Sequence, residues 1–174
     1  KYLRKKYHDN KKIIIIEDDI LNVNLSKFKN LIIISNLPYN ISTKIILYLF
    51  NFNKNIYELI IMIQKEVALK FDYNLPKMNK YKFLTYIVSI YSRLFDVSSK
   101  VFVPKPKVKS TVVKFRFNKK DFDKEKAIKF SNLIFKNIRK KINNNINIKN
   151  SNQLLDKRVN QLTIEELINI YNFF

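Results

Sequence analysis

The first two thirds of the chain alternate short apolar runs with segments of helical pattern. Residues 13–16 and 31–35 are continuous apolar runs rich in isoleucine, which is typical of strands buried on both faces. Residues 58–63 predict a third strand. The helical segments that we expect around these strands are residues 1–12, 43–52 (capped by Ser42 or Thr43), 64–70 and 81–92. Strands that alternate with helices indicate a mainly parallel sheet.

Two further strands follow, separated by a loop that contains two prolines. Residues 94–97 predict a short strand, and residues 101–107 predict a stiff, extended loop held by Pro104 and Pro106. Residues 110–117 predict a strand with Thr, Val and Phe on one side and Val, Lys and Arg on the other. We expect this hairpin-like pair to add antiparallel edges to the sheet.

The pattern becomes entirely helical after residues 118–121, and we place a boundary near residue 119. Residues 123–142 predict one long amphipathic helix. A polar, Asn-rich connection then leads to two shorter helices over 153–159 and 163–173. The second begins with Thr163 and acidic residues, which resembles a capped helix start.

This change of pattern divides the chain into two expected parts. Residues 1–118 have the pattern of an α/β domain, and residues 119–174 have that of a small all-helical domain. The sequence contains no internal repeat.

The charge of the chain points to a polyanionic partner. Lys and Arg total 34 against 14 Asp and Glu, which gives a net charge of +20. This balance favours nucleic acid first and an anionic membrane surface second. An AT-rich coding bias is an alternative cause, because Asn, Ile, Tyr and Phe are also abundant.

Other features of the composition exclude several classes of site. The chain has no cysteine and one histidine, His8, so a disulfide framework, a thiolate metal site and a histidine cluster are excluded, and we expect no metal. No apolar run approaches the roughly 20 residues that span a bilayer. Glycine is absent, although nucleotide-binding α/β folds usually need a glycine-rich turn. Either no cofactor binds through such a turn, or the segment that carries the turn is missing.

The stretch Asn36-Leu37-Pro38-Tyr39 is the main candidate for chemistry. It follows an apolar strand and precedes a helix, so it can form a small mouth at the edge of the sheet. Tyr39 can stack on a flat base, while the Asn36 amide oxygen and the Leu37 carbonyl accept hydrogen bonds from an exocyclic amine. Two acceptors localise the lone pair of an adenine amine, which suits methyl transfer to that nitrogen. An ordinary strand-to-helix turn is the alternative.

Two other residues could complete this site. Asp19 follows the first apolar run and could accept a hydrogen bond from the adenine amine of a cofactor; the alternative is an aspartate in a solvent-exposed loop. Phe102 lies on the proline-containing loop and could cover the other face of a flipped base; the alternative is a core phenylalanine.

Two groups of cations are candidates for phosphate binding. The first belongs to the proline-containing loop and the second to the end of the expected long helix; their members are Lys105, Lys107 and Lys109, and Arg139, Lys140 and Lys141. The first group could instead protect an edge strand, and the second could complement a helix dipole.

These stretches occur together and in order, and with them the chain resembles the ribosomal RNA adenine dimethyltransferases and the related erythromycin-resistance methyltransferases. The matching stretches are residues 19–21, 36–43, 64–68, 102–110, 135–146 and 162–165. The resemblance implies a Rossmann-like methyltransferase sheet and transfer of two methyl groups from S-adenosylmethionine to each of two adjacent adenines in small-subunit rRNA. It implies that Asn36 and Leu37 hold the amine, that Tyr39 and Phe102 stack on the base, and that Asp19, with Asn36, contacts the donor.

The resemblance also implies partners and leaves alternatives. We expect a monomer that acts on the immature small ribosomal subunit in a bacterial-type cytoplasm or an organelle of bacterial descent. The family's glycine-rich donor loop would lie upstream of residue 1, so this chain is expected to bind the donor poorly or not at all. A non-catalytic RNA- or DNA-binding relative and a large-subunit methyltransferase that confers macrolide resistance remain open.

Overall fold

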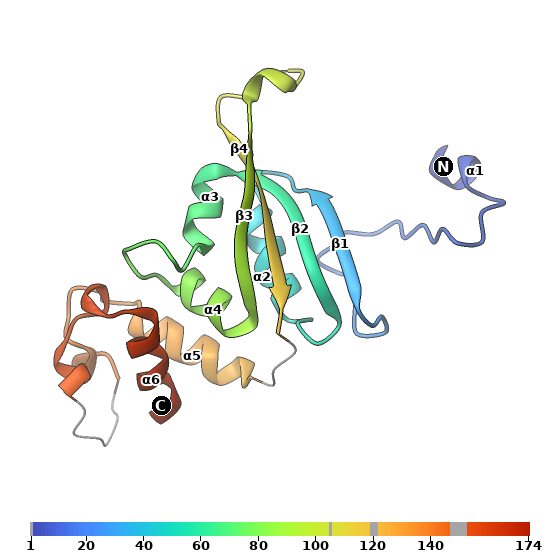
Figure 1. Ribbon diagram of the computed structural model, residues 1–174. Coiled ribbons are helices and arrows are strands. Elements are labelled where there is room, and N and C mark those ends of the chain that lie inside the picture. The colour runs from blue at the N-terminus through green and yellow to red at the C-terminus, as the bar shows by residue number, and fades with distance from the viewer. Residues whose placement is uncertain (1, 105, 119–121, 147–152) are drawn as a thin grey trace.

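The computed structural model describes residues 2–104, 106–118, 122–146 and 153–174, and within these a four-stranded sheet forms the centre of the molecule (Figure 1). The strands are β1 (Leu31–Asn36), β2 (Ile56–Gln64), β3 (Ser89–Val97) and β4 (Ser110–Phe117), in the order β1-β2-β4-β3. The helices are α1 (Tyr2–Lys6), α2 (Ser42–Phe50), α3 (Lys65–Phe71), α4 (Lys80–Val88), α5 (Lys124–Ile134) and α6 (Ile164–Phe173). Short 3-10 turns cover Ser99–Val101, Ile142–Asn144, Gln153–Asp156 and Val159–Gln161.

The fold is α/β, as predicted, but the direction of the strands differs from the prediction. β1 and β2 are parallel, whereas β4 lies antiparallel to both β2 and β3. A mainly parallel sheet is therefore wrong for the strands described, because β4 inserts between β2 and β3. The alternation predicted for 110–117 is confirmed, since Val113, Phe115 and Phe117 are buried and Arg116 is exposed.

The main core lies between one face of the sheet and the helices α2 and α3 (Figure 1). Phe115 on β4 makes ring contacts there with Phe50, Phe71 and Tyr91. The opposite face is open along β1, where Ile32 and Ile34 are 60% and 77% exposed. The prediction that residues 31–35 are buried on both faces is therefore wrong, although the strand itself is confirmed.

The first apolar run does not form the predicted strand. Residues 13–16 have no regular secondary structure, and Ile14 is 76% exposed. A strand needs a neighbour to satisfy its backbone N–H and C=O groups, and within the described residues none pairs with this run. The basic helix predicted over 1–12 is also shorter, because α1 ends at Lys6.

Three predicted helices have different bounds. α4 ends at Val88, because Ser89 pairs with Phe117 and starts β3, so residues 89–92 are strand. The long helix predicted over 123–142 ends at Ile134. The chain then turns back and buries Ile142 among the helices. The helix predicted over 153–159 consists of 3-10 turns.

The helix starts show which capping predictions were correct. Thr163 accepts a hydrogen bond from the Glu166 N–H at 3.2 Å, and the Glu166 carboxylate accepts one from the Thr163 N–H at 2.9 Å. This capping box confirms the predicted start of α6. α2 instead begins at Ser42 after Ile41 without a side-chain cap, and Ser42 donates backwards to the Tyr39 carbonyl.

A second core cluster joins α5 and α6 to α4. Phe130 lies at its centre, with the rings of Phe83, Tyr171 and Phe174 around it. α4 contributes to both clusters, and its Leu84 packs against each. The division into domains over 1–118 and 119–174 stays a prediction, and residues 119–121 lie outside the described residues. None of the described helices is long and apolar enough to span a bilayer.

A buried lysine holds the loop between α3 and α4. The Lys82 ammonium donates to the carbonyls of Leu75 and Pro76 at 2.7 and 2.6 Å. Burial lowers the pKa of Lys82, and the nearby carboxylate of Asp72 acts in the opposite direction. The side chain thus works as a cross-link between α4 and the loop.

We expect Lys82→Met to lower the free energy of unfolding by about 1–3 kcal/mol, because the carbonyls of Leu75 and Pro76 lose a charged donor. Urea unfolding measures this loss. Lys80→Met is the matched control, since this half-buried lysine lies over the Tyr81 ring and its removal should change stability by less than about 0.5 kcal/mol. Equal losses in the two variants would contradict the role assigned to Lys82.

Candidate functional site

The turn after β1 is fixed by backbone hydrogen bonds. The Leu37 N–H donates to the Met62 carbonyl on β2 at 3.2 Å, and the Leu37 side chain is buried. The Ile41 N–H donates to the Pro38 carbonyl at 3.3 Å, and the Ser42 hydroxyl donates to the Tyr39 carbonyl at 3.2 Å. Asn36 and Tyr39 therefore project from a backbone anchored to both the sheet and α2.

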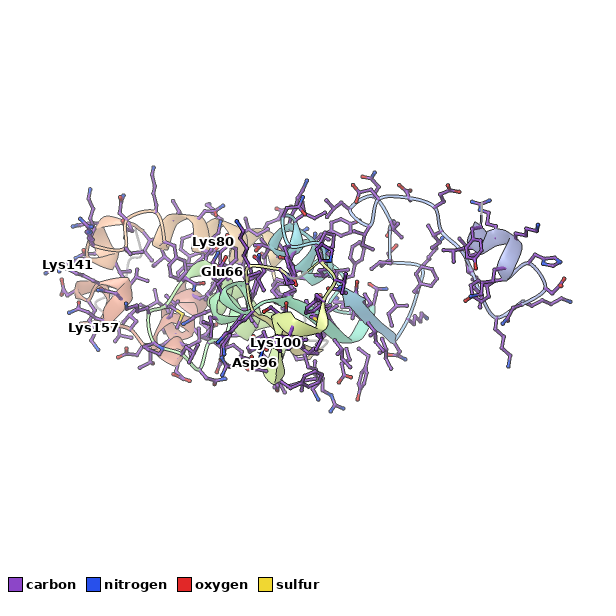
Figure 2. The ribbon with its side chains drawn as sticks, turned by 90° about the horizontal axis from the view of Figure 1, so that it is seen from above. Glu66, Lys80, Asp96, Lys100, Lys141 and Lys157 are labelled. Carbon is purple, nitrogen blue, oxygen red and sulfur yellow. The ribbon has the colours of Figure 1, made fainter. Side chains whose placement is uncertain are left out.

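The loop between β3 and β4 projects beyond the strand ends (Figure 1) and is held at its base. The Lys65 N–H donates to the Lys109 carbonyl at 2.9 Å, and the Thr111 hydroxyl donates to the Phe95 carbonyl at 3.0 Å. The Lys65 ammonium also pairs with the Asp96 carboxylate. Hydrogen bonds from Lys65, above all, and from Thr111 lower the pKa of Asp96. Asp96 and Lys100 are labelled near this base in Figure 2.

The turn and the loop line one open cavity of about 400 Å³. Its lining residues come from both segments: Asn36, Leu37, Pro38 and Tyr39 from the turn, and Phe102, Val103, Pro104 and Pro106 from the loop. This size falls within the roughly 300–1,000 Å³ of ordinary small-molecule sites. The structure thus brings the predicted amine acceptors and both predicted stacking rings to one place.

The Tyr39 hydroxyl has a partner that we did not predict as part of the site. The Tyr39 hydroxyl and the Ser110 hydroxyl lie 2.7 Å apart in a hydrogen bond. Ser110 is fully buried at the start of β4. The sequence signal was present, since Ser110 ends the matching stretch 102–110, but nothing in that stretch indicates its partner.

Asp19 does not lie with these residues. Its side chain is exposed and accepts a hydrogen bond from the Leu21 N–H at 3.0 Å, and it does not line the cavity. Of the two residues predicted to contact a methyl donor, only Asn36 lines the cavity. Of the predicted site residues, Asn36–Tyr39 and Phe102 therefore share one cavity, and Asp19 does not line it.

The two groups of predicted cations lie far apart. Lys107 and Lys109 are exposed on the loop beside the cavity, and Lys105 lies outside the described residues. Arg139 and Lys140 are exposed in turns after α5 rather than at the end of a long helix.

The third cation of this second group already has a protein partner. The Lys141 ammonium pairs with the Asp156 carboxylate at 3.3 Å. Figure 2 shows Lys141 near Lys157, and both lie well away from Asp96 and Lys100. An RNA that contacts both groups of cations must therefore reach from the loop between β3 and β4 to the turns after α5 (Figure 2).

Comparison with known proteins adds to this geometry. The sequence model described as ribosomal RNA adenine dimethylase matches residues 1–174. A protein named ribosomal RNA small subunit methyltransferase A from Mycoplasma capricolum is 34% identical over 91% of this chain and 68% of its own length. The protein of the same name from Thermotoga maritima is 38% identical over 80% of this chain and 51% of its own length.

Solved structures with low sequence identity share the fold. A dimethyladenosine transferase from Plasmodium falciparum superposes with a TM-score of 0.68 at 18% identity, covering 99% of this chain and 79% of that chain. A 23S rRNA methyltransferase, ErmE, superposes with a TM-score of 0.67 at 15% identity, covering 98% and 75%.

Proposed function

Because the chain belongs to the ribosomal RNA adenine dimethylase family, we propose that the cavity between Asn36–Tyr39 and Phe102 holds an adenine of ribosomal RNA for methylation of its amine. Enzymes of this family take the methyl group from S-adenosylmethionine. The observation that carries the proposal is that one cavity joins an Asn-Leu-Pro-Tyr turn to an aromatic residue on a loop far away in sequence.

The acceptors on the turn account for the activation of a poor nucleophile. The lone pair of an adenine amine is delocalised into the ring. The Asn36 amide oxygen and the Leu37 carbonyl oxygen accept hydrogen bonds from the two N–H groups of the adenine amine. These bonds draw the amine nitrogen out of conjugation with the ring. The same oxygens stabilise the positive charge that develops on nitrogen before its proton leaves. No strong general base is required.

The two rings account for the binding of the base. Tyr39 and Phe102 are both half-buried, so each has a surface that a flat ligand can cover. Stacking contributes about 1–3 kcal/mol per base and does not depend on a particular sequence. The neighbouring Val103 is fully exposed, which gives the loop an apolar tip at the mouth of the cavity.

The relatives named small subunit methyltransferase A support small-subunit rRNA as the substrate. We propose that the protein acts as a monomer on the immature small subunit, in a bacterial cytoplasm or an organelle of bacterial descent. The test incubates the native protein and S-adenosylmethionine with immature small subunits, or with large-subunit RNA, and measures dimethyladenosine by mass spectrometry. Methylation of large-subunit RNA alone would indicate the macrolide-resistance activity, and RNA binding without methylation would indicate a non-catalytic relative.

We expect RNA binding to weaken steeply as salt concentration rises, because each contact between a cation and a phosphate releases a counterion. Lys107→Glu combined with Lys109→Glu should reduce the slope of log K against log salt by roughly 0.7 for each lost contact with single-stranded RNA. Fluorescence anisotropy at several salt concentrations measures this slope. Lys27→Glu, an exposed change before the start of β1, should leave the slope nearly unchanged. An affinity that is independent of salt would exclude phosphate binding by either group of cations.

A further inference from the structure

We propose that Ser110 is a positioning residue that holds the Tyr39 ring in the stacking orientation, an inference that rests on the proposed function of the cavity. The carrying observation is the 2.7 Å hydrogen bond between the two hydroxyl groups. It joins the turn after β1 to the first residue of β4, directly after the loop that carries Phe102. The bond therefore ties together the two walls of the cavity.

Ser110 is a fixed anchor. It pairs with Gln64 of β2 on one side and with Val97 of β3 on the other, and it is fully buried. The residue on each side of it is also held, since the Lys109 carbonyl accepts a hydrogen bond from the Lys65 N–H and the Thr111 hydroxyl donates to the Phe95 carbonyl. A side chain bonded to Ser110 therefore has a fixed end point.

Tyr39 is held at both of its ends. At the backbone, its carbonyl accepts a hydrogen bond from the Ser42 hydroxyl. At the far end of the ring, its hydroxyl forms a hydrogen bond with the Ser110 hydroxyl. Fixing both ends removes rotation about the side-chain bonds before a base arrives, so less freedom is lost on binding. The engaged hydroxyl also leaves the ring itself, rather than the phenol group, as the part that Tyr39 offers to a base.

The test uses Ser110→Ala, Tyr39→Phe and the double variant, because each single change removes the same hydrogen bond and Tyr39→Phe keeps the ring. RNA with 2-aminopurine at the target position reports stacking by loss of fluorescence, and single-turnover methylation at saturating RNA reports the rate. We expect both single variants to lose about three- to tenfold in rate and a matching part of the quenching. RNA affinity, measured by anisotropy, should stay unchanged because contacts to phosphates mainly set it. The double variant should be no worse than either single variant.

Ser89→Ala is the matched control. Ser89 is also a buried serine at the start of a strand, and its hydroxyl donates to the Thr85 carbonyl at 3.1 Å, away from the cavity. If Ser110→Ala only lowers the melting temperature, as Ser89→Ala can, and keeps the wild-type rate and quenching, the positioning role is overturned. Losses that multiply in the double variant overturn it as well. If Ser110→Ala does not fold, Tyr39→Phe alone decides by the same rate and quenching criteria.

The wild type separates this inference from the proposed function. A wild type that quenches 2-aminopurine and methylates adenine, together with unaffected variants, refutes only the role of Ser110. A wild type that does neither refutes the proposed function and the positioning role with it.

Discussion

An Asn36→Ala variant is expected to lose methyl transfer by about two to three orders of magnitude while its affinity for RNA stays near that of the wild type. Removal of one preorganised hydrogen-bonding group at a reacting centre typically costs this much in rate. Asn36 ends β1 and lines the cavity with an exposed side chain, so its loss leaves no hole in the core. RNA affinity is set mainly by contacts to phosphates and by stacking, which the change leaves in place.

Single-turnover methylation and RNA anisotropy measure the two quantities side by side. Asn40→Ala is the matched control, because Asn40 is also an exposed asparagine of the same turn but does not line the cavity. Its rate should stay within a few-fold of wild type. An Asn36→Ala variant that methylates normally would mean that the amine is held elsewhere, and a parallel loss of rate and RNA affinity would mean that the turn has lost its shape.

Predictions of the fold succeeded where short-range chemistry decides the structure. Residues 110–117 alternate strictly, and β4 has the predicted bounds. The start of α6 depends on Thr163 and Glu166, which lie three residues apart and cap each other. Both signals are complete within a few residues of sequence.

The predictions failed where partners far away in sequence decide. Residues 89–92 have a helical pattern, but pairing of β3 with β4 makes them strand. Residues 13–16 have the composition of a strand but form none, and Ile13, Ile14 and Ile16 are exposed. The chain after Ile134 leaves its helical pattern because Ile142 is buried among the helices of the second cluster. The spacing of apolar residues indicates the local preference for helix or strand, and it contains no information about contacts with distant parts of the chain.

The candidate site also has features that the sequence predicted and features that depend on distant contacts. The turn over 36–39 and Phe102 were found from residue types and order, and they line one cavity. The bond between Tyr39 and Ser110 could not be predicted, because it depends on β4 lying beside β2. Asp19 does not line this cavity. Its carboxylate accepts a hydrogen bond from the Leu21 N–H of its own loop, so its position is that of the alternative, an aspartate in a solvent-exposed loop. The roles of these residues stay predictions.

Phe130→Ala is expected to lower the free energy of unfolding of the helical part by about 3–5 kcal/mol and to leave the sheet folded. Its ring is fully buried, and its centre lies 5.2–5.3 Å from the ring centres of Phe83, Tyr171 and Phe174, so truncation leaves a cavity at the centre of the second cluster. Such a loss is comparable with the whole stability of a small domain. Hydrogen exchange should show faster exchange in α5 and α6 than in β2 and β4.

Phe115→Ala is the matched change in the other cluster, because Phe115 is equally buried and contacts three rings between the sheet and its helices. It should increase exchange throughout the sheet and abolish the quenching of 2-aminopurine, which Phe130→Ala should preserve. The comparison tests the domain boundary predicted near residue 119. If both variants raise exchange equally everywhere, α4 couples the two clusters into one cooperative unit, since its residues pack against each of them, and the boundary is wrong.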